Sequence, residues 1–453
     1  MGWLKFFQER TNEVKTMIDE NVLPFKLELS SEKLTPHVGL VLAHEFHVGL
    51  GVDRLVDAHL PGPLSNRGYR PSEVVLPVVL MLLGGGRDLE DIGVIAGDGA
   101  LREAAGLTDV PAASTLGDWL RRTGASEAGM AGLAGVNDRL TGCRYNRLTR
   151  TEHTLDTDTT IIEAHKEDAT RAYDGTVGYQ PMVGFLDDTR WLLHEEFRTG
   201  SASPQAGGVA FIAACRKRMP RGHRIAELRS DSAFYNHDVT DYCHHQGIIY
   251  TIAADWDPAV EAAYAAVPDD AWAPVPVAEG EPPREVAETV HTFNDGNHPF
   301  RLVFIRDVED QLMLLDDGRR PRRLAVATNA PVEHRSTAEV IAHYNQRGTM
   351  ENYIKELKHG FGMLGVPCGQ EHANAAWFRI GALAYNLFLM QQAFGLPPEL
   401  LHVTVATVRW RLYQIAARLV RHARQLVLKV ATDLETFAVL SDLRLVSRSF
   451  AFP

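Results

Sequence analysis

Residues 151–162 read TEHTLDTDTTII, and this stretch marks a change in the texture of the sequence. It is rich in β-branched residues and alternates apolar with polar positions, which is typical of a strand. Side chains on a strand point alternately to its two faces, so Asp156 and Asp158 share one face. The stretch therefore predicts a strand that carries two carboxylates on the same side.

The sequence that follows predicts a sheet. Residues 178–199 contain two apolar-rich strands around the pair Asp187 and Asp188, which indicates a hairpin. The chain then continues with a helix at 205–219, a strand at 223–234, a helix at 237–247 and a strand at 248–254. Three antiparallel strands followed by crossover units predict a five-stranded mixed sheet between helices, an α/β fold.

The second half of the chain contains an expected insertion and two expected helices. The insertion begins acidic and Pro-rich and continues with probable strands at 299–307, 311–317 and 322–329. A helix should start near Ser336, where Glu339 completes a capping box, and run to about residue 359. An apolar packing helix should follow at 374–395.

These elements divide the 453 residues into five regions. The N-terminal region contains short helices broken by glycines, which suit a helix-turn-helix module or a plain helical bundle. The expected regions are a helical N-terminal DNA-binding region (1–148), the first part of a catalytic core (149–254), a β-rich insertion subdomain (255–332), the second part of the core (333–395) and a helical basic C-terminal region (396–453).

The net charge of −12 argues against a nucleic-acid partner, because phosphate is usually bound by a basic surface. The charge is segregated, however: residues 400–432 carry six Lys or Arg and no acid, whereas residues 255–288 carry nine acids and one Arg. If the basic segment is helical, it forms either a phosphate-binding stripe or a solvated face. The residues of this stripe are Arg411, Arg418, Arg421 and Lys429.

Cysteine usage and hydropathy indicate the compartment. The four cysteines show no C-x2-C pairing, so we expect reduced thiols and neither a disulfide framework nor a structural zinc site. The start of the sequence lacks a basic segment followed by an apolar run, and the longest apolar stretch is too short to span a bilayer. We expect a cytoplasmic protein with no membrane partner.

Residues 344–358, YNQRGTMENYIKELK, place polar side chains at helical spacing. At 3.6 residues per turn, Tyr344, Glu351 and Lys358 recur at seven-residue steps and Arg347 lies between the first two. A polar stripe of this kind faces a ligand or solvent, since a stripe facing the core would be apolar. The alternative is a solvated face with an i,i+4 pair of Arg347 and Glu351.

Carboxylates from three places could form one site. The strand acids, Asp231 at the end of the strand at 223–234, and Glu351 are the hard oxygen ligands that Mg²⁺ or Mn²⁺ prefers. Two such ions about 3.5–4 Å apart activate a nucleophile and stabilise the leaving oxygen of a phosphodiester. Taken singly, each Asp is better explained as a turn residue or helix cap. With DNA as ligand, phosphate oxygens would be held by Tyr344, Arg347 and Lys358.

Three segments carry a family resemblance. LDTDTT (155–160), RSDSAF (229–234) and YNQRGTMENYIKELK resemble the catalytic blocks of bacterial insertion-sequence DDE transposases, in the group bearing the Tyr-Arg-Glu-Lys signature. The last block matches that signature at every position, and the resemblance extends from about residue 150 to 390. It implies an RNase H-like fold, interrupted by the β-rich insertion before the third acid.

The resemblance also implies the ligands of two Mg²⁺ or Mn²⁺ ions. Asp231 is the second acid and Glu351 the third. Asp158 is favoured as the first acid because the family's Asp precedes a small residue and a Thr. Asp156 stays an alternative, since it follows the apolar Leu155 as a strand-embedded catalytic Asp often does.

The activity that the resemblance implies is transposition, in which the enzyme cuts at the terminal inverted repeats of the element and joins the ends to target DNA. A homodimer in a synaptic complex would carry it out, at the bacterial nucleoid. Relatives often form a DNA hairpin and stack a flipped base on a Trp, for which Trp256 and Trp272 are candidates unless they are core residues. The alternatives are a catalytically silent DNA-binding protein and an RNase H-like metal-dependent nuclease. End recognition by the N-terminal helices could use Arg67, Arg70, Arg121 and Arg122.

Overall fold

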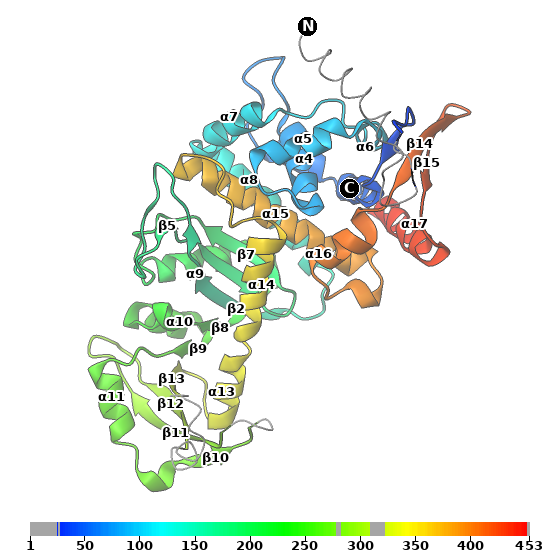
Figure 1. Ribbon diagram of the computed structural model, residues 1–453. Helices are drawn as coiled ribbons and strands as arrows, with labels where there is room; N and C mark the ends of the chain where they lie inside the picture. Colours follow the sequence, from blue (N-terminus) through cyan, green and yellow to red (C-terminus); the bar gives the residue numbers. More distant parts are fainter. Residues whose placement is uncertain (1–24, 26–27, 278–281, 309–321, 451–453) are drawn as a thin grey trace.

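The computed structural model describes residues 25, 28–277, 282–308 and 322–450, which form a mixed α/β structure with one large sheet (Figure 1). The N-terminal region is helical, as its sequence predicts. Its helices are α2 (Val38–Gly49), α3 (Val52–His59), α4 (Pro71–Gly84), α5 (Ile92–Gly97), α6 (Gly99–Ala105), α7 (Ala113–Gly124) and α8 (Glu127–Tyr145).

The large sheet contains all five strands predicted around the acids. They are β2 (Glu152–Thr159), β6 (Met182–Leu186), β7 (Trp191–Glu196), β8 (Arg224–Ser230) and β9 (Ile249–Ala253). Their order in space is β7-β6-β2-β8-β9, with β2, β8 and β9 parallel and β6 antiparallel to its two neighbours. The ends of β2 and β8 therefore meet at one edge of the sheet.

In the described part of the chain this sheet has nine strands, because the strands of the insertion extend the expected five-stranded sheet. The insertion adds β13 (Arg323–Thr328), β12 (Phe300–Asp307), β11 (Arg284–His291) and β10 (Ala273–Val275). β13 pairs antiparallel with β9, because the edge of β9 would otherwise leave unpaired backbone groups. The strand expected at 311–317 lies outside the described residues.

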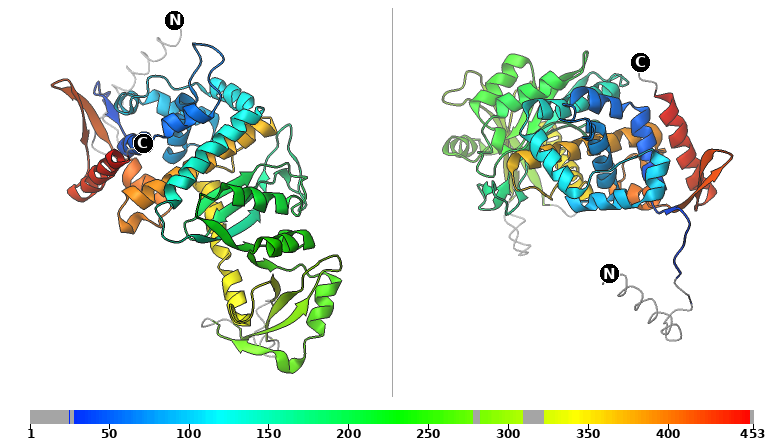
Figure 2. Two further views of the ribbon diagram at one scale, coloured as in Figure 1. Left: turned by 180° about the vertical axis from the view of Figure 1, so that it is seen from behind. Right: turned by 90° about the horizontal axis from the view of Figure 1, so that it is seen from above.

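Helices cover both faces of the sheet. Crossover helices α9 (Gly208–Arg218) and α10 (His237–Gln246) lie on one face, and α13 (Thr337–Asn345) and α14 (Gly348–Lys355) cross the other (Figures 1 and 2). The largely buried α15 (Glu371–Gly395) contacts β7 and also α4, α7 and α8. The N-terminal helices thus share a core with the sheet.

The helix expected over residues 338–359 is three consecutive segments. α13 ends at Asn345, α14 begins at Gly348, and a π-helical turn, η5 (Glu356–Gly360), follows. A glycine is a poor helix former, which accounts for the interruption. Arg347 keeps helical dihedral angles (φ −55, ψ −30), so the axis continues. The predicted capping box of Ser336 and Glu339 is confirmed.

Residues 400–430 are not the single basic helix that we expected. They form α16 (Val405–Val408), a π-helical turn η7 (Arg409–Tyr413), and a hairpin of β14 (Ala417–His422) and β15 (Gln425–Val430), followed by α17 (Leu434–Ser449). The alternation of ARLVRH and QLVLKV favours strands. The predicted stripe of Arg411, Arg418, Arg421 and Lys429 therefore does not lie on one helical face.

The cysteines and the apolar segments bear on two further expectations. All four cysteines are free, and three of them are buried. No helix in the described part of the chain has the length and apolar character needed to cross a bilayer.

Candidate active site

Two of the predicted acids meet where β2 and β8 end. Asp158 is the penultimate residue of β2, and Asp231 directly follows β8, where its Oδ1 accepts a hydrogen bond of 3.1 Å from the Ala233 amide as a helix cap. The parallel pairing of β2 with β8 brings both side chains to the same edge. Their side chains are 16% and 32% exposed, so the pair is open to a small ligand.

Arg347 connects these two carboxylates. Its Nη2 lies 2.9 Å from Asp158 Oδ2 and 3.7 Å from Asp231 Oδ2. Burial raises the pKa of Asp158 to about 7. The positive charge of Arg347 lowers this pKa and the negative charge of Asp231 raises it further. One guanidinium thus compensates the negative charge of the pair only in part. The pairing predicted as an alternative, Arg347 with Glu351, is absent from the described residues.

Glu351 lies on α14, one turn beyond Arg347. Its side chain is exposed and forms no hydrogen bond or ion pair with the described residues. The structure therefore brings Asp158 and Asp231 together and leaves the exposed carboxylate of Glu351 on α14, out of contact with the pair.

The other two members of the stripe lie close to the acids. Lys358 donates from Nζ to the Ile161 carbonyl oxygen across 2.8 Å; burial lowers the pKa of this lysine and the charge of Asp158 opposes the effect. Tyr344 is half-buried against a valine-rich cluster, and burial raises the pKa of its hydroxyl. Both side chains flank the carboxylates rather than bulk solvent.

Asp156, the alternative first acid, is in a different environment. It is fully buried and accepts two hydrogen bonds from Arg229, at 2.6 Å from Nε and 2.7 Å from Nη2. Arg229 is also fully buried. Sequence reasoning missed Arg229; the only signal was a charged residue inside a strand, two positions before Asp231.

The predicted DNA contacts outside this site are dispersed. Arg411 is exposed on η7, while Arg418 pairs with Glu32 at 2.9 Å and Arg421 with Glu103 at 3.0 Å. In the N-terminal region, Arg67 and Arg122 are exposed, Arg70 pairs with Glu73 at 2.9 Å, and Arg121 pairs with Asp118. The structure places these arginines on several elements, not on one patch.

The two tryptophans of the insertion are packed. Trp256 contacts Phe304 and carries Arg323 4.2 Å above its ring centroid. Trp272 has Arg306 3.8 Å above its ring centroid. An arginine therefore already covers one face of each indole.

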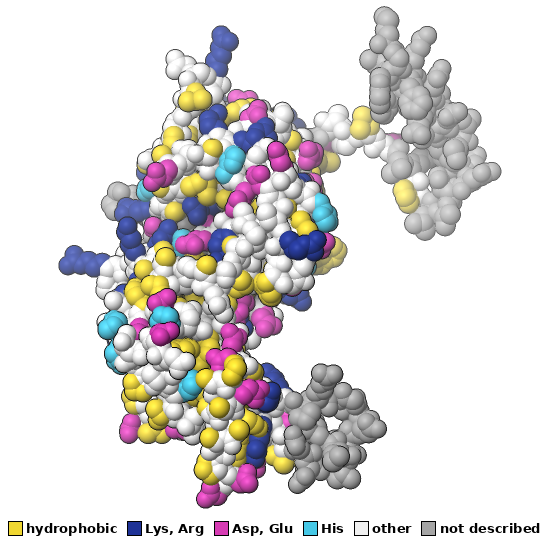
Figure 3. Space-filling model, turned by 90° about the vertical axis from the view of Figure 1, so that its left-hand side faces the viewer, with side chains coloured by type: hydrophobic (Ala, Val, Ile, Leu, Met, Phe, Trp, Pro, Cys, Tyr) yellow, Lys and Arg dark blue, Asp and Glu magenta, His cyan; other side chains and the backbone are white. Residues whose placement is uncertain are grey.

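Arginines from β12 and β13 neutralise part of the acidity of the insertion. Glu288 pairs with Arg301, Glu285 with Arg306 at 3.1 Å and Glu261 with Arg323 at 2.6 Å. On the face shown in Figure 3, acidic and basic side chains are interspersed. The acid-rich segment read from the sequence is thus not a uniformly negative surface.

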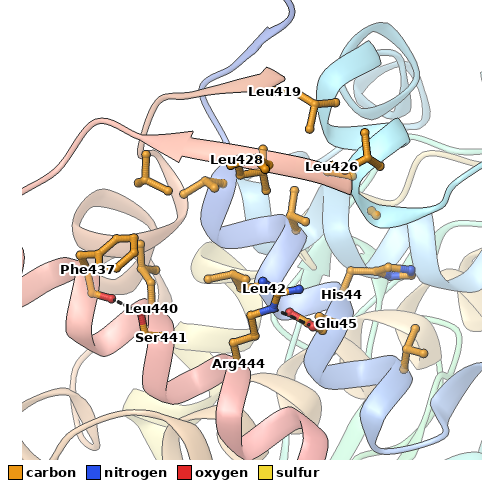
Figure 4. A pocket seen from close by; sticks show the side chains of 17 residues that line it. Leu42, His44, Glu45, Leu419, Leu426, Leu428, Phe437, Leu440, Ser441 and Arg444 are labelled. Atoms are coloured by element: carbon orange, nitrogen blue, oxygen red, sulfur yellow. Dashed lines mark hydrogen bonds and ion pairs between the residues drawn. The ribbon is translucent and has the colours of Figure 1, made fainter. Parts of the chain in front are cut away.

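A cavity of about 520 Å³ lies apart from the acids, between α2, the β14–β15 hairpin and α17 (Figure 4). Its walls are mostly apolar, including Leu428 and Phe437, and its charged pair is Glu45 with Arg444 at 3.1 Å. It has no cluster of carboxylates. A hard divalent cation is therefore better matched by the sheet edge that carries Asp158 and Asp231 than by this cavity.

The carboxylate pair suits a hard divalent cation. Burial and a like-charged neighbour raise the pKa of Asp158, which is the environment that an added positive charge relieves. The described residues contain no preformed group of three side chains that could hold a metal, because Glu351 is not in contact with the pair. A complete ligand set would need Glu351 to approach.

The comparison with protein-family models agrees with the resemblance to DDE transposases. A family model described as transposase DDE domain group 1 matches residues 22–446. A solved structure, the cryo-EM structure of a piggyBac transposase synaptic complex with hairpin DNA, is 8% identical with a TM-score of 0.42, over 93% of this chain and 82% of that chain. No curated protein sequence matches the chain.

Proposed function

We infer that Asp158, Asp231 and Arg347 form the catalytic centre of this chain, which belongs to the family of DDE transposases whose model matches residues 22–446. The protein would cut DNA at the ends of its own insertion sequence and join those ends to target DNA. The observation that carries this assignment is the meeting of Asp158 with Asp231 at one sheet edge, bridged by Arg347 at 2.9 and 3.7 Å.

The strand order supports an RNase H-like core. The order β7-β6-β2-β8-β9, with only β6 antiparallel to its neighbours, is the arrangement that the resemblance implies for the sheet carrying the acids. The first acid would then lie on the central strand β2 and the second after the adjacent β8. The complete spacing of Tyr344, Arg347, Glu351 and Lys358 supports membership of the Tyr-Arg-Glu-Lys group and a bacterial insertion-sequence origin.

Among the two candidate first acids, Asp158 is the better assignment. Arg229 already satisfies both oxygens of Asp156, and neither residue is exposed to solvent. Asp158 is partly exposed and forms an ion pair with Arg347, which also lies near Asp231 and so is not committed to Asp158 alone. A ligand that reaches the sheet edge would meet Asp158 before Asp156.

Mg²⁺ or Mn²⁺, held by Asp158 and Asp231 and joined by Glu351, would activate the attacking hydroxyl and neutralise phosphate charge. Arg347 would bind a non-bridging phosphate oxygen, because a guanidinium released from Asp158 is a strong donor to phosphate. Lys358 would hold a neighbouring phosphate, and Tyr344 would donate its hydroxyl at the same strand. These contacts fix the scissile phosphodiester in front of the acids.

The DNA ends would be held outside the centre by exposed arginines. Arg411, Arg418 and Arg421 lie on η7 and the β14–β15 hairpin, and we assign them to the DNA backbone, not to base edges. Two copies of the chain would act together, because excision requires both ends of the element. We place the protein in the bacterial cytoplasm at the nucleoid.

The test is cleavage of labelled linear DNA that carries the flanking ends of the gene, with Mg²⁺ or Mn²⁺ added. Wild type should cut at the ends, while Asp158→Asn, Asp231→Asn and Glu351→Gln should each lose cutting by about 10³-fold or more. Glu333→Gln, which removes an exposed carboxylate from the loop before α13, is the matched control and should cut normally. Denaturing gels would reveal a hairpin product.

Two results would overturn this assignment. If wild type binds the ends but never cuts with either metal, a catalytically silent DNA-binding protein is the better account. If it cuts any DNA equally and never joins a freed 3′ end, the protein is a nuclease on the same fold.

A further inference from the structure

Behind the three residues of the proposed centre lies a second layer of three residues. Asp156 is two positions before Asp158 on β2, Arg229 is two positions before Asp231 at the end of β8, and Gln346 directly precedes Arg347. On a strand, residues two apart share a face, so the two layers lie side by side on the same side of the sheet. Arg229 is the centre of this second layer.

Arg229 makes hydrogen bonds or ion pairs with all three of its nitrogens. Besides the two bonds to Asp156, Nη2 lies 2.8 Å from Asp187 Oδ2, at the turn of the β6–β7 hairpin. Nη1 donates to Gln346 Oε1 at 3.0 Å and to the His343 carbonyl oxygen at 3.3 Å. A single buried side chain thus links β2, β8, a hairpin turn and the junction of α13 with α14.

The junction is the part of this network that needs a fixed position. At the junction the backbone bonds reach back three residues and not four: the Gln346 amide donates to the His343 carbonyl oxygen at 3.3 Å and the Arg347 amide to that of Tyr344 at 2.9 Å. Such bonds have poorer geometry than those of an α-helix, so the junction is a weak point of the helix. The planar fork of a guanidinium fixes several acceptors in one geometry, which a lysine could not do. We propose that Arg229 is a positioning residue, which sets the α13–α14 junction so that Arg347 and Glu351 face Asp158 and Asp231.

This inference rests on the proposed function for its meaning in catalysis, although its structural content can be tested without catalysis. A buried ion pair can be replaced by apolar residues of similar volume with little loss of stability, whereas removal of one partner leaves an unpaired buried charge. Arg229→Met alone should therefore fold poorly. Asp156→Val/Arg229→Met should recover cooperative unfolding, but no group in it would hold Gln346.

The double variant separates a positioning role from a merely structural one. In Asp156→Val/Arg229→Met we expect amide hydrogen exchange across residues 343–351 to accelerate at least tenfold, measured without metal or DNA. The Mn²⁺ concentration for half-maximal end cleavage should rise at least tenfold. Gln346→Ala, which changes an exposed residue and removes one of the two links between Arg229 and the junction, should shift both readouts in the same direction by a smaller amount, with unchanged unfolding.

The matched control removes another buried arginine–carboxylate pair. Glu195→Val/Arg379→Met breaks the pair between β7 and α15, in which the side chains are 6% and 16% exposed. It should leave exchange at residues 343–351 and the Mn²⁺ requirement at wild-type values. If it shifted both readouts as the Arg229 double variant does, the effects would be those of removing any buried pair and the inference would fail.

Two further outcomes decide the inference. If Asp156→Val/Arg229→Met regains wild-type exchange and wild-type cleavage, Arg229 only stabilises the fold and the inference is wrong. If wild type cleaves no DNA, the proposed function fails, and faster exchange at residues 343–351 in Gln346→Ala would still support the role of Arg229 in setting the junction.

Discussion

Arg347 lies against both acids of the proposed centre, with its Nη2 2.9 Å from Asp158 Oδ2 and 3.7 Å from Asp231 Oδ2. In the absence of other cations the guanidinium is the counter-ion of the carboxylates. A divalent ion would compete for the same oxygens, and its arrival would release Arg347 toward a phosphate. Metal binding and DNA binding should therefore be coupled through this one side chain.

The substitution Arg347→Gln tests that coupling. Without DNA, the variant should bind Mn²⁺ about tenfold more tightly, because a positive charge next to the ligands has been removed. End cleavage should nevertheless fall by about 10²-fold or more, because the phosphate loses a charged donor. Mn²⁺ binding is measured from the rise in unfolding temperature as Mn²⁺ is added, and end cleavage is measured at saturating Mn²⁺.

Arg335→Gln is a suitable control for this variant. Arg335 is similarly shielded, at 14% exposed, and pairs with Glu227 at 3.1 Å near the start of α13, so the substitution should not tighten Mn²⁺ binding. Weaker binding of Mn²⁺ to Arg347→Gln would contradict the prediction. It would mean that Arg347 orders the carboxylates and does not compete for them.

The raised pKa of Asp158 predicts how stability depends on pH. An Asp in the unfolded chain has a pKa of about 3.9, whereas burial raises the pKa of Asp158 in the folded chain to about 7. Between these values the folded chain holds a proton that the unfolded chain has released. The contribution of Asp158 to the free energy of unfolding therefore falls as the pH rises through this window.

Asp158→Asn removes this dependence. Relative to wild type, the variant should gain about 1–3 kcal/mol in its free energy of unfolding at about pH 8 and much less at about pH 5. Urea unfolding of both proteins at the two pH values provides the measurement. A gain of equal size at both pH values would show that another change, and not the charge on Asp158, is responsible.

The places of Asp158, Asp231 and Glu351 in the fold could be predicted from sequence because their signals are local. Period-two alternation located β2, and the spacing of Tyr344, Arg347, Glu351 and Lys358 on a helix gave the polar stripe. Which of Asp156 and Asp158 is open to a ligand could not be predicted. That depends on Arg229, whose pairing with Asp156 arises from the parallel register of two strands that are far apart in the sequence.

The β14–β15 hairpin could not be recognised for a different reason. Its two turn residues, Ala423 and Arg424, have positive φ values of 47 and 66, which a two-residue hairpin turn of this type requires. Glycine and asparagine are the usual signals of such a turn, and neither is present. A run of cations with apolar residues therefore predicts an amphipathic helix in place of the hairpin.

The same two turn residues give a stability prediction. An L-residue in the left-handed region costs roughly 1 kcal/mol relative to glycine, so Arg424→Gly should raise the free energy of unfolding by up to about 1 kcal/mol. Arg418→Gly, at the second residue of β14, should lower it by about 0.5–1 kcal/mol, because glycine weakens a strand. Urea unfolding at fixed pH measures both changes. Equal destabilisation by the two glycines would contradict the hairpin geometry.

The proposed DNA contacts on η7 and the hairpin differ in how far they are already neutralised. Arg418 pairs with Glu32 at 2.9 Å, whereas Arg411 is exposed and forms no ion pair with the described residues. In a complex with duplex DNA, each cation that binds a phosphate adds about 0.9 to the steepness of log K against log salt concentration. Arg411→Gln should therefore reduce the slope by about 1, and Arg418→Gln by less.

Binding of the labelled terminal repeat between about 50 and 200 mM salt measures these slopes. The two variants should fold normally, so a difference between them reports DNA binding and not stability. A slope unchanged in Arg411→Gln would remove η7 from the DNA-binding surface. A slope reduced by a full unit in Arg418→Gln would mean that DNA displaces Glu32 from Arg418. The free energy of breaking that pair would then reduce the affinity of wild type for DNA. In that case Glu32→Gln should bind the same DNA more tightly.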